Sequence, residues 1–216
     1  MIKLSYSNHP TLSRPADTVI VLDFETTGLS PTQGDRAIEI GAVMLKDGKV
    51  IERFQQLMNP GFRISGFIES YTGISNAMLT DAPSCEEVME QFSDFIGDYN
   101  LVAHNASFDQ RFLDAELKRI NCDYSGQFAC SMLIARRLYQ AAPNHKLGSL
   151  INYKNIQHDG VFHRALADSE MTASLWLAML EDLNQDYQLQ SPNFGLLQSI
   201  AKQSKANINQ YLNRQS

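Results

Sequence analysis

The sequence has few cysteines and no long apolar run, and each of these absences excludes a class of protein. Its three cysteines, Cys85, Cys122 and Cys130, are odd in number and form no CxxC pair, which argues against a disulfide framework and a zinc site. Unpaired cysteines fit the reducing cytoplasm, where we expect the protein to be located. No apolar run approaches membrane-spanning length, so we expect no membrane contact. The first ten residues lack the apolar core of a signal peptide.

Positive charge is also scarce. The 18 Lys and Arg residues are outnumbered by 24 Asp and Glu residues, which gives a net charge of −6. This balance argues weakly against a general nucleic-acid binder, which needs a basic surface. The objection weakens if several acids form a metal cluster, because two bound Mg²⁺ ions would bring the charge from −6 to −2.

The chain does contain short apolar strands followed by helical patterns, and its 216 residues can bury a sizeable core. Three strands come first, and an Asp-Gly hairpin signal joins the second to the third. Helices then alternate with two short strands, and the longest helix runs from Arg164 to about Leu183. This order predicts an α/β fold, in which a mixed β-sheet is flanked by α-helices. The first predicted strand covers residues 19–22 and the few residues directly after them. The other predicted strands cover residues 37–45, 50–58, 101–103 and 128–130.

Two carboxylates lie at the end of the first strand. Side chains alternate along a strand, so Asp23 and Glu25 project from the same side. Like charges this close repel each other, and a divalent cation such as Mg²⁺ or Mn²⁺ would remove the conflict. The alternative is a surface Asp and Glu that are solvated separately.

Three further residues lie at helix starts. Asp109 follows a strand and opens a helix, where an N-cap is the simpler explanation. His163 lies just before the longest helix and Asp168 about one turn inside it, so both could point at a common centre. Taken singly, His163 could be a surface or hydrogen-bonded loop residue and Asp168 part of a solvated helix face.

Together these segments resemble the DEDDh exonucleases, the superfamily of the proofreading epsilon subunit of bacterial DNA polymerase III. The resemblance covers roughly Thr18 to Leu183, and it implies a ribonuclease H-like fold. It is carried, in this order, by Asp-Phe-Glu-Thr-Thr-Gly-Leu, Ala-Ile-Glu-Ile-Gly-Ala-Val, Thr-Gly-Ile, Ala-His-Asn-Ala-Ser-Phe-Asp and His-Arg-Ala-Leu-Ala-Asp.

The resemblance implies a role for each of five residues. Asp23, Glu25, Asp109 and Asp168 match the four carboxylates that bind two Mg²⁺ or Mn²⁺ ions, and His163 matches the general base. Two such ions, about 3.5–4 Å apart, would screen the phosphodiester, activate a water and stabilise the leaving oxygen. Asp23 would bridge both ions.

The resemblance also implies a pocket for the terminal 3′ nucleotide. Thr26, Thr27 and Gly28 would supply backbone donors and a close approach, Leu29 would wedge against the base, and Phe108 would stack on it or wall the pocket. Core packing is the alternative for Leu29 and Phe108. We also expect substrate contacts from a second set of residues, which comprises Thr72, His104 and Asn105.

Thr72-Gly73-Ile74 departs from the His-Gly-Ile of many relatives, so a histidine contact to substrate is absent and the branch of the family stays open. The leading expectation is a metal-dependent 3′→5′ exonuclease that releases 5′-nucleoside monophosphates from DNA single strands or 3′ ends. The alternatives are an RNA-trimming relative of ribonuclease T or oligoribonuclease, and a non-catalytic nucleic-acid-binding module. A polymerase or repair partner is possible, and whether the protein proofreads, repairs or recycles stays open.

We expect three parts in the chain: an extended arm over 1–17, an exonuclease domain over 18–184 and a helical tail over 185–216. In the tail, Ser191-Pro192 predicts a helix start, and apolar residues from Leu197 to Leu212 fall along one helical face. Packing on the domain is the favoured role of this helix. Contact with the nucleic-acid backbone or a partner is the alternative, because the tail is net positive.

Overall fold

A five-stranded sheet in the order β3-β2-β1-β4-β5 forms the centre of the protein. The structure is a computed structural model, and it describes residues 10–158 and 164–215. β1 pairs antiparallel with β2 and β2 antiparallel with β3, whereas β4 runs parallel to both β1 and β5. The predicted mixed sheet is therefore confirmed. The strands are β1 (Val19–Thr26), β2 (Ala37–Lys46), β3 (Lys49–Leu57), β4 (Leu101–Ala103) and β5 (Phe128–Cys130).

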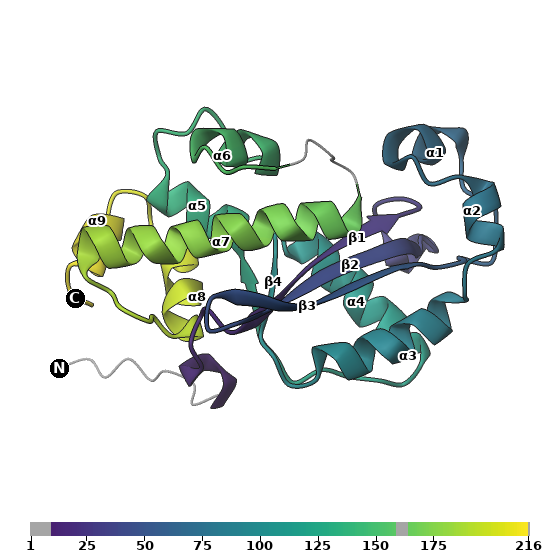
Figure 1. The fold of residues 1–216 in the computed structure, drawn as a ribbon, viewed down its shortest axis with the longest axis horizontal. Coiled ribbons are helices and arrows are strands. Elements are labelled where there is room, and N and C mark those ends of the chain that lie inside the picture. Colours follow the sequence, from purple (N-terminus) through teal and green to yellow (C-terminus); the bar gives the residue numbers. More distant parts are fainter. Residues whose placement is uncertain (1–9, 159–163, 216) are drawn as a thin grey trace.

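Helices cover both faces of this sheet (Figure 1). Helix α7 (Ala165–Tyr187) lies along one face, whereas α3 (Cys85–Ile96) and α4 (Ser107–Arg119) cover the other. Within the described ranges, no helix combines the length and the apolar character that crossing a bilayer requires. The smaller helices are α1 (Gly66–Thr72), α2 (Asn76–Thr80), α5 (Ser131–Leu138), α6 (Leu147–Tyr153), α8 (Phe194–Lys202) and α9 (Ile208–Leu212), with short 3₁₀ turns at Pro10–Ser13 and Pro31–Gln33.

The first strand is buried on both faces. Val19 and Val21 pack in the cluster that contains α7, and Ile20, Leu22 and Phe24 pack in the cluster that contains α3 and α4. Because side chains alternate, the row that starts with Val19 and Val21 continues as Asp23 and Glu25 on the α7 face. The apolar run thus determines which helix the two carboxylates meet.

Three serines lie at positions where the sequence pattern predicts a helix cap, and only Ser84 is one. The pattern Ser84-Cys85-Glu86-Glu87 predicts a capping box, and Ser84 does cap α3 in a reciprocal capping box with Glu87. Ser131 follows a predicted strand and could cap the next helix, but it is the first residue of α5, and its hydroxyl donates to Ala103 O at 3.3 Å. In the tail the cap is Asn193 rather than Ser191, because the Asn193 side chain accepts from Leu196 N at 2.8 Å.

The tail forms two helices instead of one, since the extended backbone of Gln203 ends α8. Both helices pack into the α7-side core, and the ring of Phe194 lies 6.2 Å from that of Trp176. Helix α7 itself continues to Tyr187, past the predicted boundary at 184–185. The three-part division of the chain stays a prediction. The tail side chains buried in this core are Leu189, Phe194, Leu197, Ile200, Ile208 and Leu212.

Candidate active site

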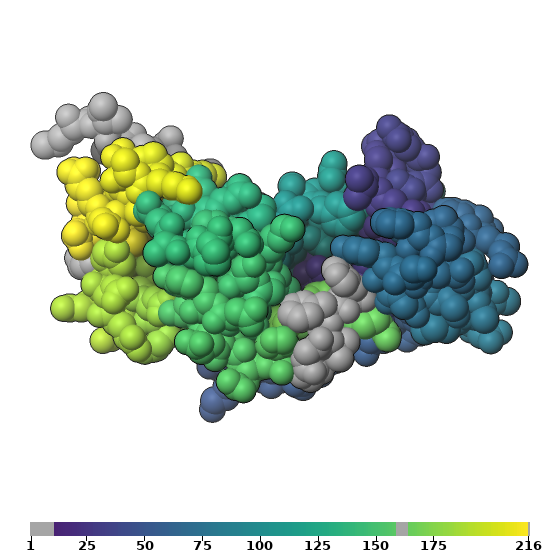
Figure 2. Space-filling view, turned by 90° about the horizontal axis from the view of Figure 1, so that it is seen from above, coloured from purple at the N-terminus to yellow at the C-terminus, as the bar shows by residue number. Residues whose placement is uncertain are grey.

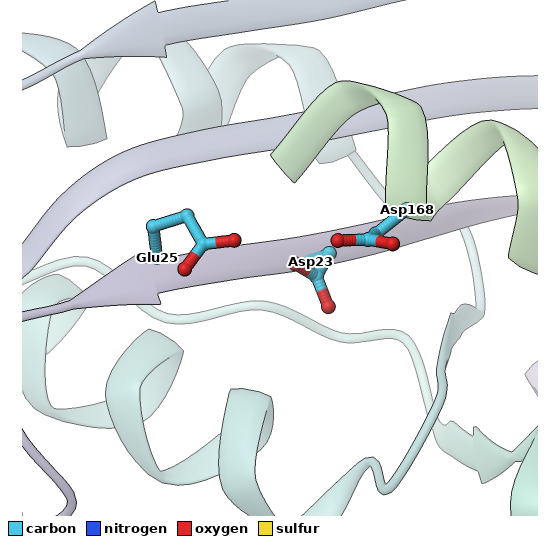
Figure 3. Close-up of side chains that lie close together, drawn as sticks. All are labelled: Asp23, Glu25 and Asp168. Atoms are coloured by element: carbon cyan, nitrogen blue, oxygen red, sulfur yellow. The ribbon is translucent and has the colours of Figure 1, made fainter. Parts of the chain in front are cut away.

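Three carboxylates meet at the end of β1, where the first turn of α7 passes over the strand (Figure 3). Oxygen atoms of Asp23, Glu25 and Asp168 all lie within 4.8 Å of one another. Two of these residues come from one face of β1, and the third is the fourth residue of α7. Residues far apart in sequence therefore form one compact acidic cluster.

The fourth predicted ligand, Asp109, lies in the first turn of α4 and is 2% exposed. It is not the helix N-cap: its Oδ1 accepts a hydrogen bond from Phe24 N at 3.2 Å, between the two acids of β1. Burial raises the pKa of Asp23, and the charge of Asp109 raises it further. The structure thus brings three of the four acids into one cluster and turns the fourth toward the strand backbone.

Burial and mutual repulsion make this cluster hard to ionise. They raise the pKa of Asp23 well above its usual value and that of Glu25 to about 8, and burial raises that of Asp109 to about 7. A divalent cation would compensate these charges, and carboxylate oxygens are the ligands that hard cations prefer. The donor set and its spacing therefore fit a divalent metal.

A buried ion pair holds the start of α7. Glu39 of β2 is fully buried, and in the strand register it lies opposite Glu25. Its carboxylate accepts from Arg164 Nη2 at 2.8 Å, Arg164 Nε at 3.1 Å and Ala165 N at 3.2 Å, and also from Gln55 Nε2 at 3.0 Å. The pair fixes the helix three residues before Asp168.

Gly41 lets the same helix lie directly on β2. A Cβ atom at this position would lie 2.1 Å from Leu166 N and from Ala165 C, which no packing tolerates. Ser169 Oγ also donates to Gly41 O at 2.9 Å. Asp168 is therefore positioned from both sides along the helix.

Sequence reasoning assigned no role to Glu39 or Arg164. The available signal was a charged residue inside the apolar strand sequence Ile38-Glu39-Ile40. A buried charge needs a partner, so an acid at a fully buried strand position predicts a nearby Arg or Lys. The identity of that partner depended on tertiary contacts across 125 positions of sequence.

The predicted pocket residues after β1 form a tight loop. Thr26 Oγ1 donates to Gly28 O at 2.6 Å, and Thr27 Oγ1 donates to Asp35 Oδ1 at 3.2 Å. A Cβ at Gly28 would lie 2.4 Å from Asp35 Oδ1, so the group closest to this glycine is a carboxylate of the protein. Leu29 is 76% exposed and free to meet a ligand, so core packing does not explain it.

The other predicted substrate-binding residues differ in accessibility. Thr72 is buried, and its hydroxyl donates to Ile68 O at 2.9 Å. The half-buried His104 ring contacts Ser131 Oγ and His145 O, each at 2.9 Å, and burial lowers its pKa to about 4. Phe108 packs on Phe112 with ring centroids 5.0 Å apart, whereas Asn105 is exposed with a left-handed φ of 72°.

The predicted base, His163, lies outside the described residues, so its role stays a prediction from the sequence. The roles of the four acids and of the substrate-binding residues likewise stay predictions. The close spacing of three of the acids supports their predicted role as metal ligands. The Thr72 and His104 side chains have hydrogen-bond partners within the protein.

Comparison with known proteins gives consistent matches. A family model described as "Exonuclease" (RNase_T) matches residues 20–176. "DNA polymerase III PolC-type" of Bacillus subtilis (strain 168) is 41% identical over 171 residues, and that of Bacillus cereus is 40% identical over 171 residues. Each match covers 77% of this chain but 12% of the relative, so the chain spans about an eighth of the length of these polymerases.

Solved structures share the fold. "Exonuclease X in complex with 5′ overhanging duplex DNA" superposes with a TM-score of 0.65 at 27% identity, covering 85% of this chain and 99% of that chain. The nuclease domain of 3′hExo, described as a DEDDh family member bound to rAMP, gives a TM-score of 0.64 at 24% identity, over 77% of this chain and 92% of that chain. The sheet and its flanking helices therefore match the predicted ribonuclease H-like arrangement.

Proposed function

The chain belongs to the exonuclease family, among the DnaQ-like DEDDh 3′→5′ exonucleases, and we propose that it removes 5′-nucleoside monophosphates from the 3′ end of single-stranded DNA. The observation that carries this proposal is the cluster of Asp23, Glu25 and Asp168, whose oxygens lie within 4.8 Å. DNA is the proposed substrate because the names of the similar proteins refer to DNA polymerase III and to a DNA complex.

Asp23, Glu25 and Asp168, together with Asp109, would hold two Mg²⁺ or Mn²⁺ ions. Bound divalent ions supply charge neutralisation for the phosphodiester, a water of lowered pKa and stabilisation of the leaving oxygen. His163 would accept the proton of the attacking water at a ring nitrogen, since an imidazole titrates near neutrality. Glu39 and Arg164 would keep Asp168 in place, and Leu29 would contact the terminal base.

The decisive experiment compares the wild type with Asp23→Ala and with the control Asp94→Ala, an exposed acid of α3. We expect 5′-mononucleotides to be released stepwise with Mg²⁺ or Mn²⁺, and chelator or Asp23→Ala to abolish release while Asp94→Ala leaves it unchanged. A 3′-phosphate should block digestion, because the added charge would face the carboxylates. Nicking of circular single-stranded DNA, or robust digestion by Asp23→Ala, would refute the proposal.

Matched DNA and RNA oligomers digested side by side decide between deoxyribonuclease and ribonuclease activity, and faster hydrolysis of RNA would refute the proposed substrate. A polymerase partner is proposed from the polymerase names of the relatives, and the cytoplasmic location from the unpaired cysteines. Both are extensions of the proposal and do not depend on the metal chemistry.

A further inference from the structure

Two segments of the chain contain no acidic residue at all. Residues 124–158 and 187–216 hold seven of the 18 Lys and Arg residues and none of the 24 Asp and Glu residues. The described part of these segments forms β5, α5, α6, α8 and α9. In a protein of net charge −6, these elements therefore form a region of net positive charge, because no acid offsets their cations.

The fold joins the two segments into one surface. Arg137 Nε donates to Gln203 O at 2.9 Å, and Gln140 Nε2 donates to Lys205 O at 2.9 Å, so the end of α5 is tied to the loop after α8. Figure 1 shows α5, α8 and α9 at the same end of the molecule. We call four of the exposed cations of this region, Arg136, Lys146, Lys202 and Lys205, the basic wall.

The charges of the basic wall are available to a ligand. Over residues 10–158 and 164–215, none of its four side chains forms an ion pair. Lys154, by contrast, lies 2.8 Å from Asp182 Oδ2. Unpaired cations that converge on one surface favour a polyanionic ligand.

The basic wall also borders the acidic cluster. The parallel register pairs Val21 of β1 with Val102 of β4, and its continuation places His104 level with Asp23 on the neighbouring strand. His104 contacts His145 O at 2.9 Å, next to Lys146, and the positive charge of Arg136 adds to the lowering of its pKa that burial causes. Figure 2 shows the green region of α5 and α6 on one side of a hollow and the blue region of α1 and α2 on the other.

The two sides of this hollow differ in charge. On the far side, residues 60–82, which include α1 and α2, carry the acids Glu69 and Asp81 and one cation, Arg63, whereas the elements of the basic wall carry no acid. We propose that the basic wall binds the phosphate backbone of the substrate strand upstream of the cleaved linkage, so that the strand leaves the acidic cluster over α6 and α5. This inference rests on the proposed function and adds a path for the strand.

The experiment uses two triple variants of equal net charge. Arg136→Gln/Lys146→Gln/Lys205→Gln neutralises three of the four residues of the basic wall, and Lys46→Gln/Lys49→Gln/Lys118→Gln neutralises three exposed cations on other elements. Hydrolysis of a dinucleotide and of a long single strand is measured for both, together with binding of a 3′-phosphorylated strand as a function of salt. The dinucleotide has a single phosphodiester, which is the cleaved linkage, so it offers no upstream phosphate to the basic wall.

We expect the wall variant to raise KM about tenfold for the long strand, with kcat and dinucleotide hydrolysis unchanged. Each phosphate contact contributes about 0.7 to the salt slope for single strands, so the slope should fall by about 2 when three contacts are lost. Equal effects of both variants, or an unchanged slope, would overturn the proposed path. If the wild type hydrolyses neither the long strand nor the dinucleotide, the proposed function is overturned, and the binding data still report on the path.

Discussion

Replacing Glu39 by glutamine tests whether the buried pair with Arg164 positions the catalytic acids. The carboxylate accepts four hydrogen bonds, two at each oxygen. A glutamine keeps one of these two oxygens and replaces the other by an NH₂ group. The two donors that bonded to the replaced oxygen then face another donor, so two of the four hydrogen bonds are lost. The side chain keeps its size, so no cavity forms.

The expected cost follows from these contacts. A hydrogen bond to a charged group contributes about 1.5–3 kcal/mol, and the 36% exposure of the Arg164 side chain reduces that contribution, so we expect a loss of about 2–4 kcal/mol. In a domain of this size that loss lowers Tm by about 6–12 °C. Because Asp168 follows Ala165 by three residues, we also expect kcat to fall about 10–100-fold, as a displacement of about 1 Å can cost 10²-fold.

Glu116→Gln is the matched control. Glu116 is also buried, accepts from Arg36 Nε at 2.8 Å and from Ala37 N at 3.3 Å, and so has the same chemistry. Because the chemistry is the same, Glu116→Gln should lower Tm by about as much as Glu39→Gln does. Because Glu116 lies two helical turns beyond Asp109, the kcat of this variant should stay within about threefold of the wild-type value. Melting temperature, kcat and KM are measured for both variants at a temperature where each is folded.

Equal losses of kcat in the two variants would refute the positioning role, since a general loss of stability would then explain both. An unchanged Tm for Glu39→Gln would refute the energetic argument itself.

Three further outcomes are expected. In the metal-free protein the pKa of Glu25 is about 8 in the folded state and 4.5 in the unfolded state, so the free energy of unfolding should fall by on the order of 4 kcal/mol as pH rises from about 5 to 8. Mn²⁺ should restore Tm most at the upper end of this range, and a melting temperature that does not change with pH in chelator would contradict this expectation. His163→Ala should lower kcat about 10²–10⁴-fold with metal affinity little changed, as titration calorimetry would measure, and a loss below tenfold would mean a structural role. Truncation after Asp186 removes six buried apolar side chains worth about 1.5–3 kcal/mol each, so we expect aggregation or a much lower Tm. Retention of the wild-type Tm would contradict the packing argument.

The sequence by itself determined the local structure around the cluster. The apolar run before Asp23 predicts a buried strand, and strand period alone places Glu25 on the same face. The Asp-Gly hairpin and the capping box at Ser84 were likewise readable, because each depends on residues within a few positions. The family resemblance supplied the remaining acids, which local pattern could not distinguish from a helix cap or a solvated face.

Only the tertiary structure decided which residues support that cluster. Glu39 meets Arg164 across 125 positions and Gly41 lets α7 lie on β2, contacts that no local pattern encodes. The hydrogen bonds of the His104 ring to Ser131 and His145 depend in the same way on neighbours brought by packing. The physical reason is that strand and helix periods fix the direction of a side chain, whereas its partners are fixed by how the elements pack.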